Sequence, residues 1–250
     1  MSQIKGAWFI CRKDLKAYYL KPPLISWGLM FPAVMVLAFY LRNPGGISEV
    51  IPGLIGITLL FGATSMEAVV IAFEKRIGAL ERLAMAPLSP AAILLGKATS
   101  GALVALGLGL VSTLVTLPFA SDNAFSLANA SAVLLTLSLG AVTFSLLGAF
   151  VSVAVREVFD AMALANYFRF PMIFLCGVFV PLAATPTALQ WIAYLLPLTY
   201  VVDPLRQLLQ SGHNASFPVA LSWGLLALFC LALYLGAWRL LLRRLEEPLS

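Results

Sequence analysis

The chain has 250 residues, of which 61% are hydrophobic and only 11% charged, and its formal net charge is +5. Soluble domains usually carry about 25% charged residues, so this composition excludes an ordinary water-soluble enzyme and indicates a membrane protein. The positive residues flank apolar segments, so the basic excess indicates a membrane topology and no nucleic-acid partner.

Six apolar runs are long enough to cross a hydrocarbon core of about 30 Å. Lipid satisfies no backbone N–H or C=O group, and the runs lack the alternation of barrel strands, so they are predicted to be helices. The predicted fold is an all-α polytopic membrane protein with one transmembrane domain over residues 1–250. Its predicted spans are 24–41, 51–73, 91–118, 131–155, 161–180 and 218–238.

The basic residues predict the orientation of these spans. With the N-terminus in the cytoplasm, all of the 16 Lys and Arg residues except Arg42 and Arg206 lie on or nearest to the cytoplasmic side. Cytoplasmic loops carry an excess of Lys and Arg, so both termini are predicted to be cytoplasmic. The first apolar run lacks a small-residue cleavage pattern, and we expect it to be retained as a helix.

Residues 4–21 precede the first span and are predicted to form an amphipathic helix in the cytoplasmic interface. Its basic residues would meet lipid headgroups, and Pro22-Pro23 would end it. The alternative is a basic flank that only sets the orientation. The predicted apolar stripe consists of Ile4, Trp8, Cys11, Leu15 and Tyr18.

Residues 75–90, between the second and third spans, form a basic, amphipathic segment. Its apolar positions share one face of a short helix, Lys75 and Arg82 lie on another, and Pro87 and Pro90 end it. This pattern predicts a contact surface. The alternative is a short connector whose charges only follow the positive-inside rule.

Residues 181–212 are too interrupted by prolines for a span and too apolar for an ordinary loop. They predict two short helices, 187–196 and 198–209, near the outer face. Irregular backbone at membrane depth requires cover by protein or a wet cavity, so this segment is expected to cap the outer end. Asp203 and Arg206 are spaced to pair.

Two motifs carry a resemblance to a known family. They are ALERLAMAPLSPAAILLGK, residues 79–97, and CGVFVPLAATPTALQWIAYLLPLTYVVDPLR, residues 176–206. In order, position and spacing they resemble the type-2 ABC exporter permease family, which includes short bacterial six-helix subunits of drug and lipo-oligosaccharide exporters. The first motif looks like that family's cytoplasmic coupling helix, and the second like its stretch between spans five and six.

The resemblance implies a permease in the bacterial inner membrane that exports an amphipathic drug, lipid or glycolipid-type substrate. It implies a homodimer bound to two copies of a cognate ATP-binding-cassette ATPase. The chain lacks a phosphate-binding loop motif, so we expect no enzyme activity and no bound cofactor here, with ATP and Mg²⁺ on the partner. The residues expected to contact that ATPase are Arg76, Leu80, Glu81, Arg82, Met85, Pro87 and Leu88.

Glu67 and Arg169 lie about 10 Å and about 13 Å inside their spans, counted from the cytoplasmic ends. Charges at such depth are costly unless they pair or meet water, so we interpret them as lining the pathway or bonding across it. The alternative is snorkelling or a static helix contact. Aromatic residues extend the candidate pathway, although they are also common at packing and lipid-facing positions. Its members are Phe39, Glu67, Asn166, Arg169, Phe170 and Phe174.

An ion-coupled secondary transporter is the main alternative function. Such proteins often contain inverted repeats and midplane ion ligands, neither of which is evident in this sequence. A single histidine, dispersed acids and three scattered cysteines do not indicate an enzyme, a metal site or a disulfide framework. A channel is a weaker alternative, because nothing resembles a selectivity filter.

Overall fold

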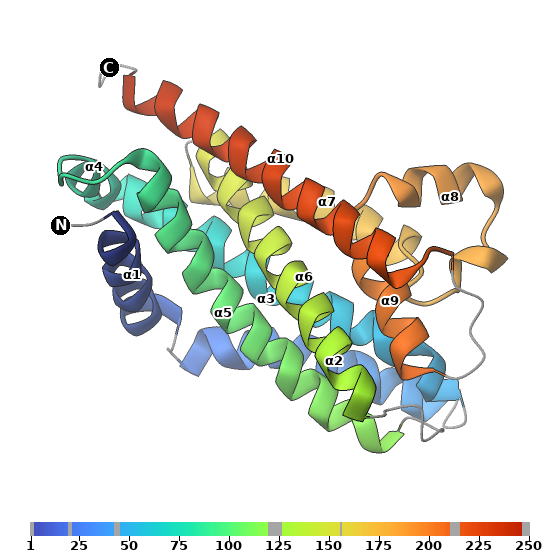
Figure 1. The fold of residues 1–250 in the computed structure, drawn as a ribbon. Helices are drawn as coiled ribbons and strands as arrows, with labels where there is room; N and C mark the ends of the chain where they lie inside the picture. The colour runs from blue at the N-terminus through green and yellow to red at the C-terminus, as the bar shows by residue number, and fades with distance from the viewer. Residues whose placement is uncertain are drawn as a thin grey trace.

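The computed structural model describes residues 3–19, 22–42, 46–119, 127–155, 157–210 and 216–246, and these residues form helices and connecting segments without a strand. The longest helices are α3 (Ile47–Arg76), α5 (Pro90–Thr116), α6 (Leu127–Ala154) and α10 (Val219–Glu246), as Figure 1 shows. An all-α fold follows from long apolar runs that must satisfy their own backbone hydrogen bonds.

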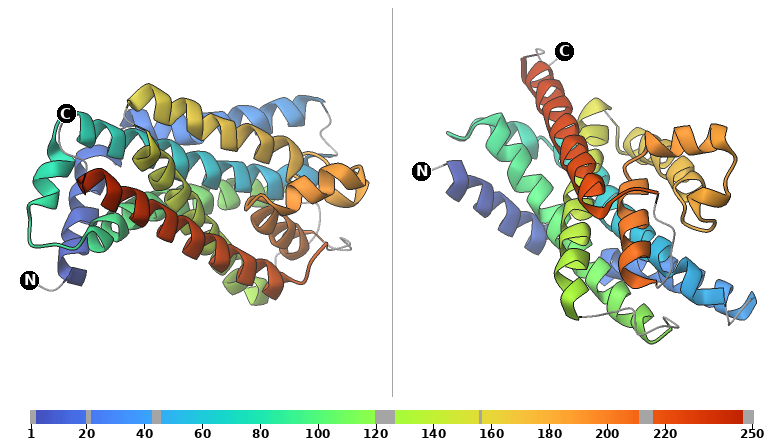
Figure 2. Two further views of the ribbon diagram at one scale, coloured as in Figure 1. Left: turned by 90° about the horizontal axis from the view of Figure 1, so that it is seen from above. Right: turned by 45° about the vertical axis from the view of Figure 1, so that its right-hand side comes forward.

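Helix α3 is the centre of the bundle. It packs against α2 (Pro22–Arg42), α5, α6, α7 (Val158–Leu175) and α9 (Thr199–Leu209). Most of its apolar length is buried, whereas α10 lies on the outside, as Figure 2 shows, and buries little of its apolar surface. The outward apolar surface of α10 is suited to lipid.

Five helices among the described residues are long and apolar enough to cross a membrane. They are Ser48–Arg76, Pro90–Thr116, Asn129–Ala154, Val158–Leu175 and Val219–Arg243. Each overlaps one of the predicted spans. The first predicted span falls in α2, where Ala33–Arg42 forms a shorter apolar stretch, so a count of six spans stays a prediction.

The helix ends differ from the predicted spans where local backbone geometry intervenes. Helix α7 ends at Leu175, before the predicted end at residue 180, and Gly177 adopts a left-handed φ of +77°. Glycine reaches this region without the steric cost of a side chain, and it commonly terminates helices. Helix α10 extends beyond residue 238 to Glu246.

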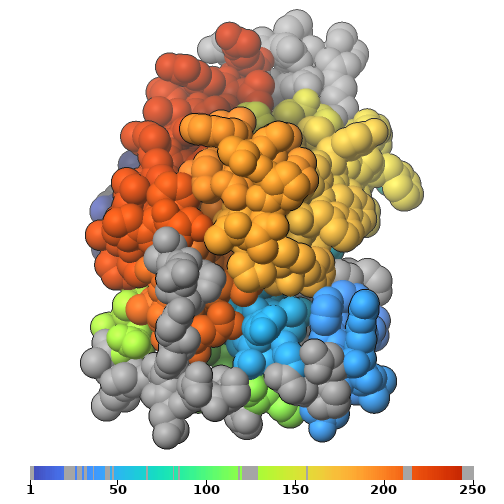
Figure 3. Space-filling model, turned by 90° about the vertical axis from the view of Figure 1, so that its right-hand side faces the viewer, coloured from blue at the N-terminus to red at the C-terminus, as the bar shows by residue number. Residues whose placement is uncertain are grey.

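Different short elements lie at the two ends of the bundle. Helices α1 (Gln3–Asp14) and α4 (Ala79–Ala84) lie at one end with the C-terminal end of α10, as Figures 1 and 2 show. Helices α8 (Thr187–Tyr194) and α9 belong to the opposite half, which faces the viewer in Figure 3. The side of the membrane on which each end lies stays a prediction.

Helix α9, which lies in the segment expected to cap the outer end, is packed deeply into the bundle. Every residue of α9 from Thr199 to Arg206 is buried. The Arg206 guanidinium donates to the Gly177 carbonyl at 2.6 Å, and the Asp203 carboxylate accepts from the backbone N–H of Phe217 at 3.3 Å. Both side chains are buried and fasten α9 to neighbouring loops, while the predicted pairing of Asp203 with Arg206 stays a prediction.

Candidate functional sites

The predicted coupling segment begins at a sharp turn after α3. Gly78 has a φ of +67°, a left-handed conformation that favours glycine, and its N–H donates to the Lys75 carbonyl at 3.1 Å. Helix α4 follows, and Ser89 then caps α5 by accepting from the Ala92 N–H at 3.2 Å. The segment is thus joined at each end to a long helix.

The residues expected to contact an ATPase separate into two groups. Arg76, Arg82, Met85 and Pro87 are exposed, and we call these four residues the coupling surface. Leu80 differs from the expectation because it is buried in an apolar cluster with Ile71 and Ile93. It therefore anchors α4 to the bundle.

Leu88 and Glu81 are the two remaining residues that were expected to contact the ATPase. Leu88 is half-buried and packs over Gly6 of α1, where a Cβ would collide with its side chain. The backbone of Glu81 belongs to α4, but its side chain lies outside the described part of the structure. The function of the whole set as a contact surface stays a prediction.

Helix α1 packs directly on the start of α5. A Cβ on Gly96 would lie 2.7 Å from the Ala7 carbonyl oxygen and 3.0 Å from the Ile10 Cβ, so the two backbones approach closely. The Ser89 N–H also donates to the Gln3 side-chain oxygen at 2.9 Å. The buried face of α1 consists of Gly6, Ile10, Cys11 and Asp14.

This buried face differs from the apolar stripe expected from the sequence. Ile4 and Trp8 are exposed, whereas Cys11 is buried. Gly6 and Gly96 lie at the contact and allow α1 to approach α5 closely. Hydropathy alone does not predict this contact face. The exposed Ile4 and Trp8 are suited to the acyl boundary, so an interfacial location of α1 stays a prediction.

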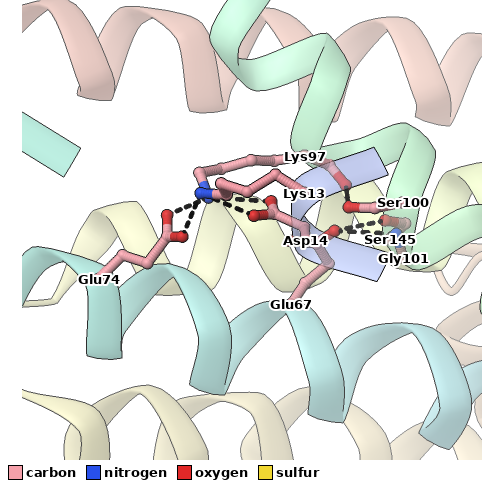
Figure 4. Close-up of polar contacts among 8 residues, drawn as sticks. All are labelled: Lys13, Asp14, Glu67, Glu74, Lys97, Ser100, Gly101 and Ser145. Carbon is pink, nitrogen blue, oxygen red and sulfur yellow. Dashed lines mark hydrogen bonds and ion pairs between the residues drawn. The ribbon is translucent and has the colours of Figure 1, made fainter. Parts of the chain in front are cut away.

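Four charged residues connect α1, α3 and α5, and we call them the charge cluster: Lys13, Asp14, Glu74 and Lys97. Lys97 is 2% exposed, and its ammonium group bonds Asp14 at 3.1 Å and also bonds Glu74. Lys13 reaches the same two carboxylates at 2.9 and 2.6 Å. Figure 4 shows the two lysines converging on the acids, so the cluster is neutral and its buried charges compensate one another.

Lys13 lies at the edge of the cluster. Partial burial would lower its pKa, but the hydrogen bonds to Glu74 and Asp14 outweigh that effect and raise the pKa above its ordinary value. Lys13 therefore stays charged at physiological pH. The sequence analysis missed this cluster, although Asp14 carries a signal: it is the single acidic residue before Glu49, within a basic stretch.

Glu67 lies deeper in the bundle, beyond the charge cluster. It is fully buried in α3, and its Oε1 accepts from the Gly101 N–H at 3.2 Å and from the Ser145 hydroxyl at 3.4 Å. Gly101 and Gly148 provide the space for it, since a Cβ on either would lie within 2.8 Å of Glu67 atoms. The site therefore joins α3, α5 and α6.

Arg169 does not bond to Glu67. Its Nε donates to the Thr64 hydroxyl at 2.6 Å, its Nη1 donates to the Asn166 side chain at 3.1 Å, and its guanidinium lies 5.0 Å from the Phe61 ring centroid. The predicted bond between the two charges is therefore absent among the described residues, while a pathway role for either stays a prediction.

Two of the aromatic candidates lie on the outward side of α7, and the third lies in α2. Phe170 and Phe174 are exposed, and Phe39 of α2 stacks on Phe179 with ring centroids 5.3 Å apart. A shallow groove of about 430 Å³ runs beside Asn166 and Phe170. Side chains of mixed polarity thus lie on a helix face that the single chain does not cover.

The matches to known proteins agree with this arrangement. Residues 6–209 match the ABC-2 type transporter family, a region that contains the coupling segment, the charge cluster and α9. The chain belongs to the ABC-2 type transporter family. As an ABC-2 permease it is a transport subunit, with several helices that are long and apolar enough to cross a membrane.

Two relatives from different bacteria share one name. The "Inner membrane transport permease YadH" of Escherichia coli K12 is 28% identical over 228 residues, which cover 90% of this chain and 87% of the relative. The YadH protein of Shigella flexneri matches with the same identity and coverage. These relatives and the apolar helices support a multi-pass protein of a bacterial inner membrane.

Proposed function

We propose that the chain is the permease subunit of an ATP-driven exporter, which moves an amphipathic substrate out of the cytoplasm or the inner leaflet. The observation that carries this proposal is the coupling surface. Exposed basic and apolar groups on a short connection are suited to a groove on a soluble partner, with Met85 as the apolar anchor.

The packing around this connection supports transmission of movement. Helix α4 continues directly from α3 through Gly78, and α5 begins directly after the segment. Helix α1 is fixed to α5 by backbone contact at Gly96 and by the charge cluster. A push by an ATPase on the coupling surface would therefore reach α3 and α5 directly, and α1 through its contact with α5.

The outward side of α7 supports a second copy of the chain as partner. Helices α7 and α10 both expose most of their length, but α7 is the less apolar of the two. Lipid suits α10, whereas Asn166 and the Arg169 that binds it suit a protein interface or a wet pathway. We infer that two α7 helices border the substrate route, where exposed aromatic rings would contact an amphipathic molecule.

Charge reversal on the coupling surface tests the proposal. Arg82→Glu is expected to reduce copurification of the cognate ATPase and transport into proteoliposomes by at least about tenfold, because a desolvated interface charge is worth about 2 kcal/mol or more. Arg82 is exposed and its only described bond, at 3.2 Å, is to the Ile77 carbonyl, so folding should persist.

Arg42→Glu is the matched control, because Arg42 is an exposed arginine at the opposite end of the bundle. It should leave copurification unchanged. Equal loss in both variants, or normal transport by Arg82→Glu, would contradict the coupling role. Transport driven by an ion gradient without any ATPase would favour the secondary-transporter alternative.

A further inference from the structure

Glu67 has no cationic partner among the described residues, unlike the buried acids Asp14 and Glu74. Each of those two acids contacts both Lys13 and Lys97, whereas the described hydrogen bonds of the Glu67 carboxyl come from the Gly101 N–H and the Ser145 hydroxyl. Figure 4 shows Glu67 apart from the lysines that hold the other two acids. A buried carboxylate without a compensating charge is strongly disfavoured relative to the neutral acid.

The local charge count gives the same result. The charge cluster contains two cations and two anions and is complete by itself, so an ionised Glu67 would add one uncompensated negative charge. The described side-chain bonds of the buried Arg169 on α7 go to Thr64 and Asn166. Within the described part of the chain, no lysine or arginine is bonded to Glu67.

Two buried polar atoms without a described hydrogen-bond partner lie at this site. Oε2 of Glu67 and the hydroxyl of Tyr19 are both fully buried, and neither has a hydrogen-bond partner among the described residues. Tyr19 ends the π-helical turn η1 (Leu15–Tyr19) that follows α1, and its hydroxyl lies beside the Glu67 carboxyl. Burial raises the Tyr19 pKa well above its ordinary value, so the phenol keeps its own proton.

The groups facing Glu67 come from each helix packed around it. Helix α1 and η1 provide Cys11, Asp14 and Tyr19, and α5 provides Lys97. Helix α6 provides the neutral Ser145. A metal ion does not fit, because no group of three or more His, Cys, Asp or Glu side chains is gathered among the described residues. A proton is the ligand that neutralises one buried carboxyl, and the resulting acid O–H can donate to the Tyr19 hydroxyl oxygen.

We propose that Glu67 is a proton-binding site, in which the neutral acid donates its O–H from Oε2 to the Tyr19 hydroxyl oxygen while Oε1 keeps its two donors. The site is closed on one side by η1, which follows α1. The next step rests on the proposed function. If an ATPase moves α1 away from α3, water would reach the carboxyl, and one proton would leave Glu67 for solvent in each such opening.

Infrared difference spectroscopy on the purified permease tests the proton directly, without an ATPase. Wild type at neutral pH is expected to show the carbonyl band of a protonated carboxylic acid, and Glu67→Gln should lose it. Glu157→Gln removes an exposed carboxyl at the start of α7 and should leave that band unchanged. A folded wild type without the band, or a band that persists in Glu67→Gln, would overturn the proposal.

Thermal stability of two variants provides an independent readout. Gln is the neutral isostere and can donate from its amide to Tyr19, so Glu67→Gln should keep Tm within about 2 °C of wild type. Glu67→Ala orphans the Gly101 N–H and leaves a cavity, so its Tm should fall by about 5 °C or more. Equal destabilisation by both variants would indicate an ionised Glu67 and would contradict the proposal. If the chain were not an exporter subunit, the infrared band and the Tm values expected for these variants would stay the same.

Discussion

At the scale of single residues, Lys97 is the buried cation at the centre of the charge cluster. Lys97 is buried beside the carboxylates of Asp14 and Glu74, which come from different segments. If Lys97 were removed, Lys13 alone would remain to neutralise both carboxylates. Truncating one member of a buried ionic network is costly, because the charges left behind stay desolvated.

Lys97→Met is expected to lower the free energy of unfolding by about 3–5 kcal/mol, the usual cost of an unpaired buried charge. The measurement is thermal unfolding of the purified protein in mild detergent. Lys16→Met is the matched control, because Lys16 is an exposed lysine in η1. The same loss of stability in both variants would show that the charge cluster does not hold α1, α3 and α5 together.

A second residue-scale prediction concerns the space beside Glu67. The Cβ of Gly101→Ala would lie 2.5 Å from Glu67 Oε1 and 2.6 Å from Ser145 Oγ, so we expect a destabilisation of about 1–3 kcal/mol. In the same helix, Gly107 has no atom within 4 Å of its Cβ position. Gly107→Ala should therefore be neutral or stabilising by up to about 1 kcal/mol. The opposite order of the two Tm values would contradict this packing.

At the scale of elements, hydropathy predicts where the long helices lie. Each span must be apolar along its whole length, whether protein or lipid covers it. Hydropathy does not predict the end of α7, which depends on the left-handed conformation of Gly177. It also does not predict the charge cluster, whose members come from three segments far apart in sequence. Such pairings are determined by tertiary packing, and only the isolated acid at Asp14 hints at them.

Helix α1 illustrates the same limit. The sequence places its apolar stripe toward lipid, but close approach at Gly96 turns Ile10 and Cys11 inward against α5. The helical spacing of apolar residues predicts that α1 is a helix. It does not predict which neighbouring helix packs against it. Small residues on the facing helix decide that choice.

The packing of α1 on α5 can be tested at Gly96. Gly96→Val would drive its side chain into the Ala7 carbonyl and Ile10, so α1 should detach locally. Cys11 is buried in wild type, and burial raises its thiol pKa, so it should react slowly with a maleimide. We expect the labelling rate of Cys11, followed by peptide mass spectrometry, to rise by at least about tenfold, which corresponds to about 1.4 kcal/mol of lost protection.

Gly224→Val in α10 is the control, because no atom lies within 4 Å of its Cβ position. It should leave Cys11 protected. Rapid labelling of Cys11 in the unaltered protein would show that α1 is not packed on α5 as described.

At the scale of the whole molecule, the bundle carries the predicted ATPase contact at one end and the tightly packed helix α9 in the opposite half. The coupling surface lies at the end that contains α1 and α4, and α9 is held by Arg206 in the opposite half. The substrate is not determined by any one residue, but the exposed aromatic side of α7 favours an amphipathic one. The sequence motifs of residues 79–97 and 176–206 predicted the family that the match over residues 6–209 shows, whereas the burial of Leu80 required the structure.

The mass and subunit composition of the complex isolated from native membranes in mild detergent test the exporter account most directly. The account predicts an assembly of two permease chains and two ATP-binding-cassette ATPase chains, from which Arg82→Glu releases the ATPase. A wild-type chain that stays free of any ATPase, under conditions that preserve other membrane complexes, would contradict it.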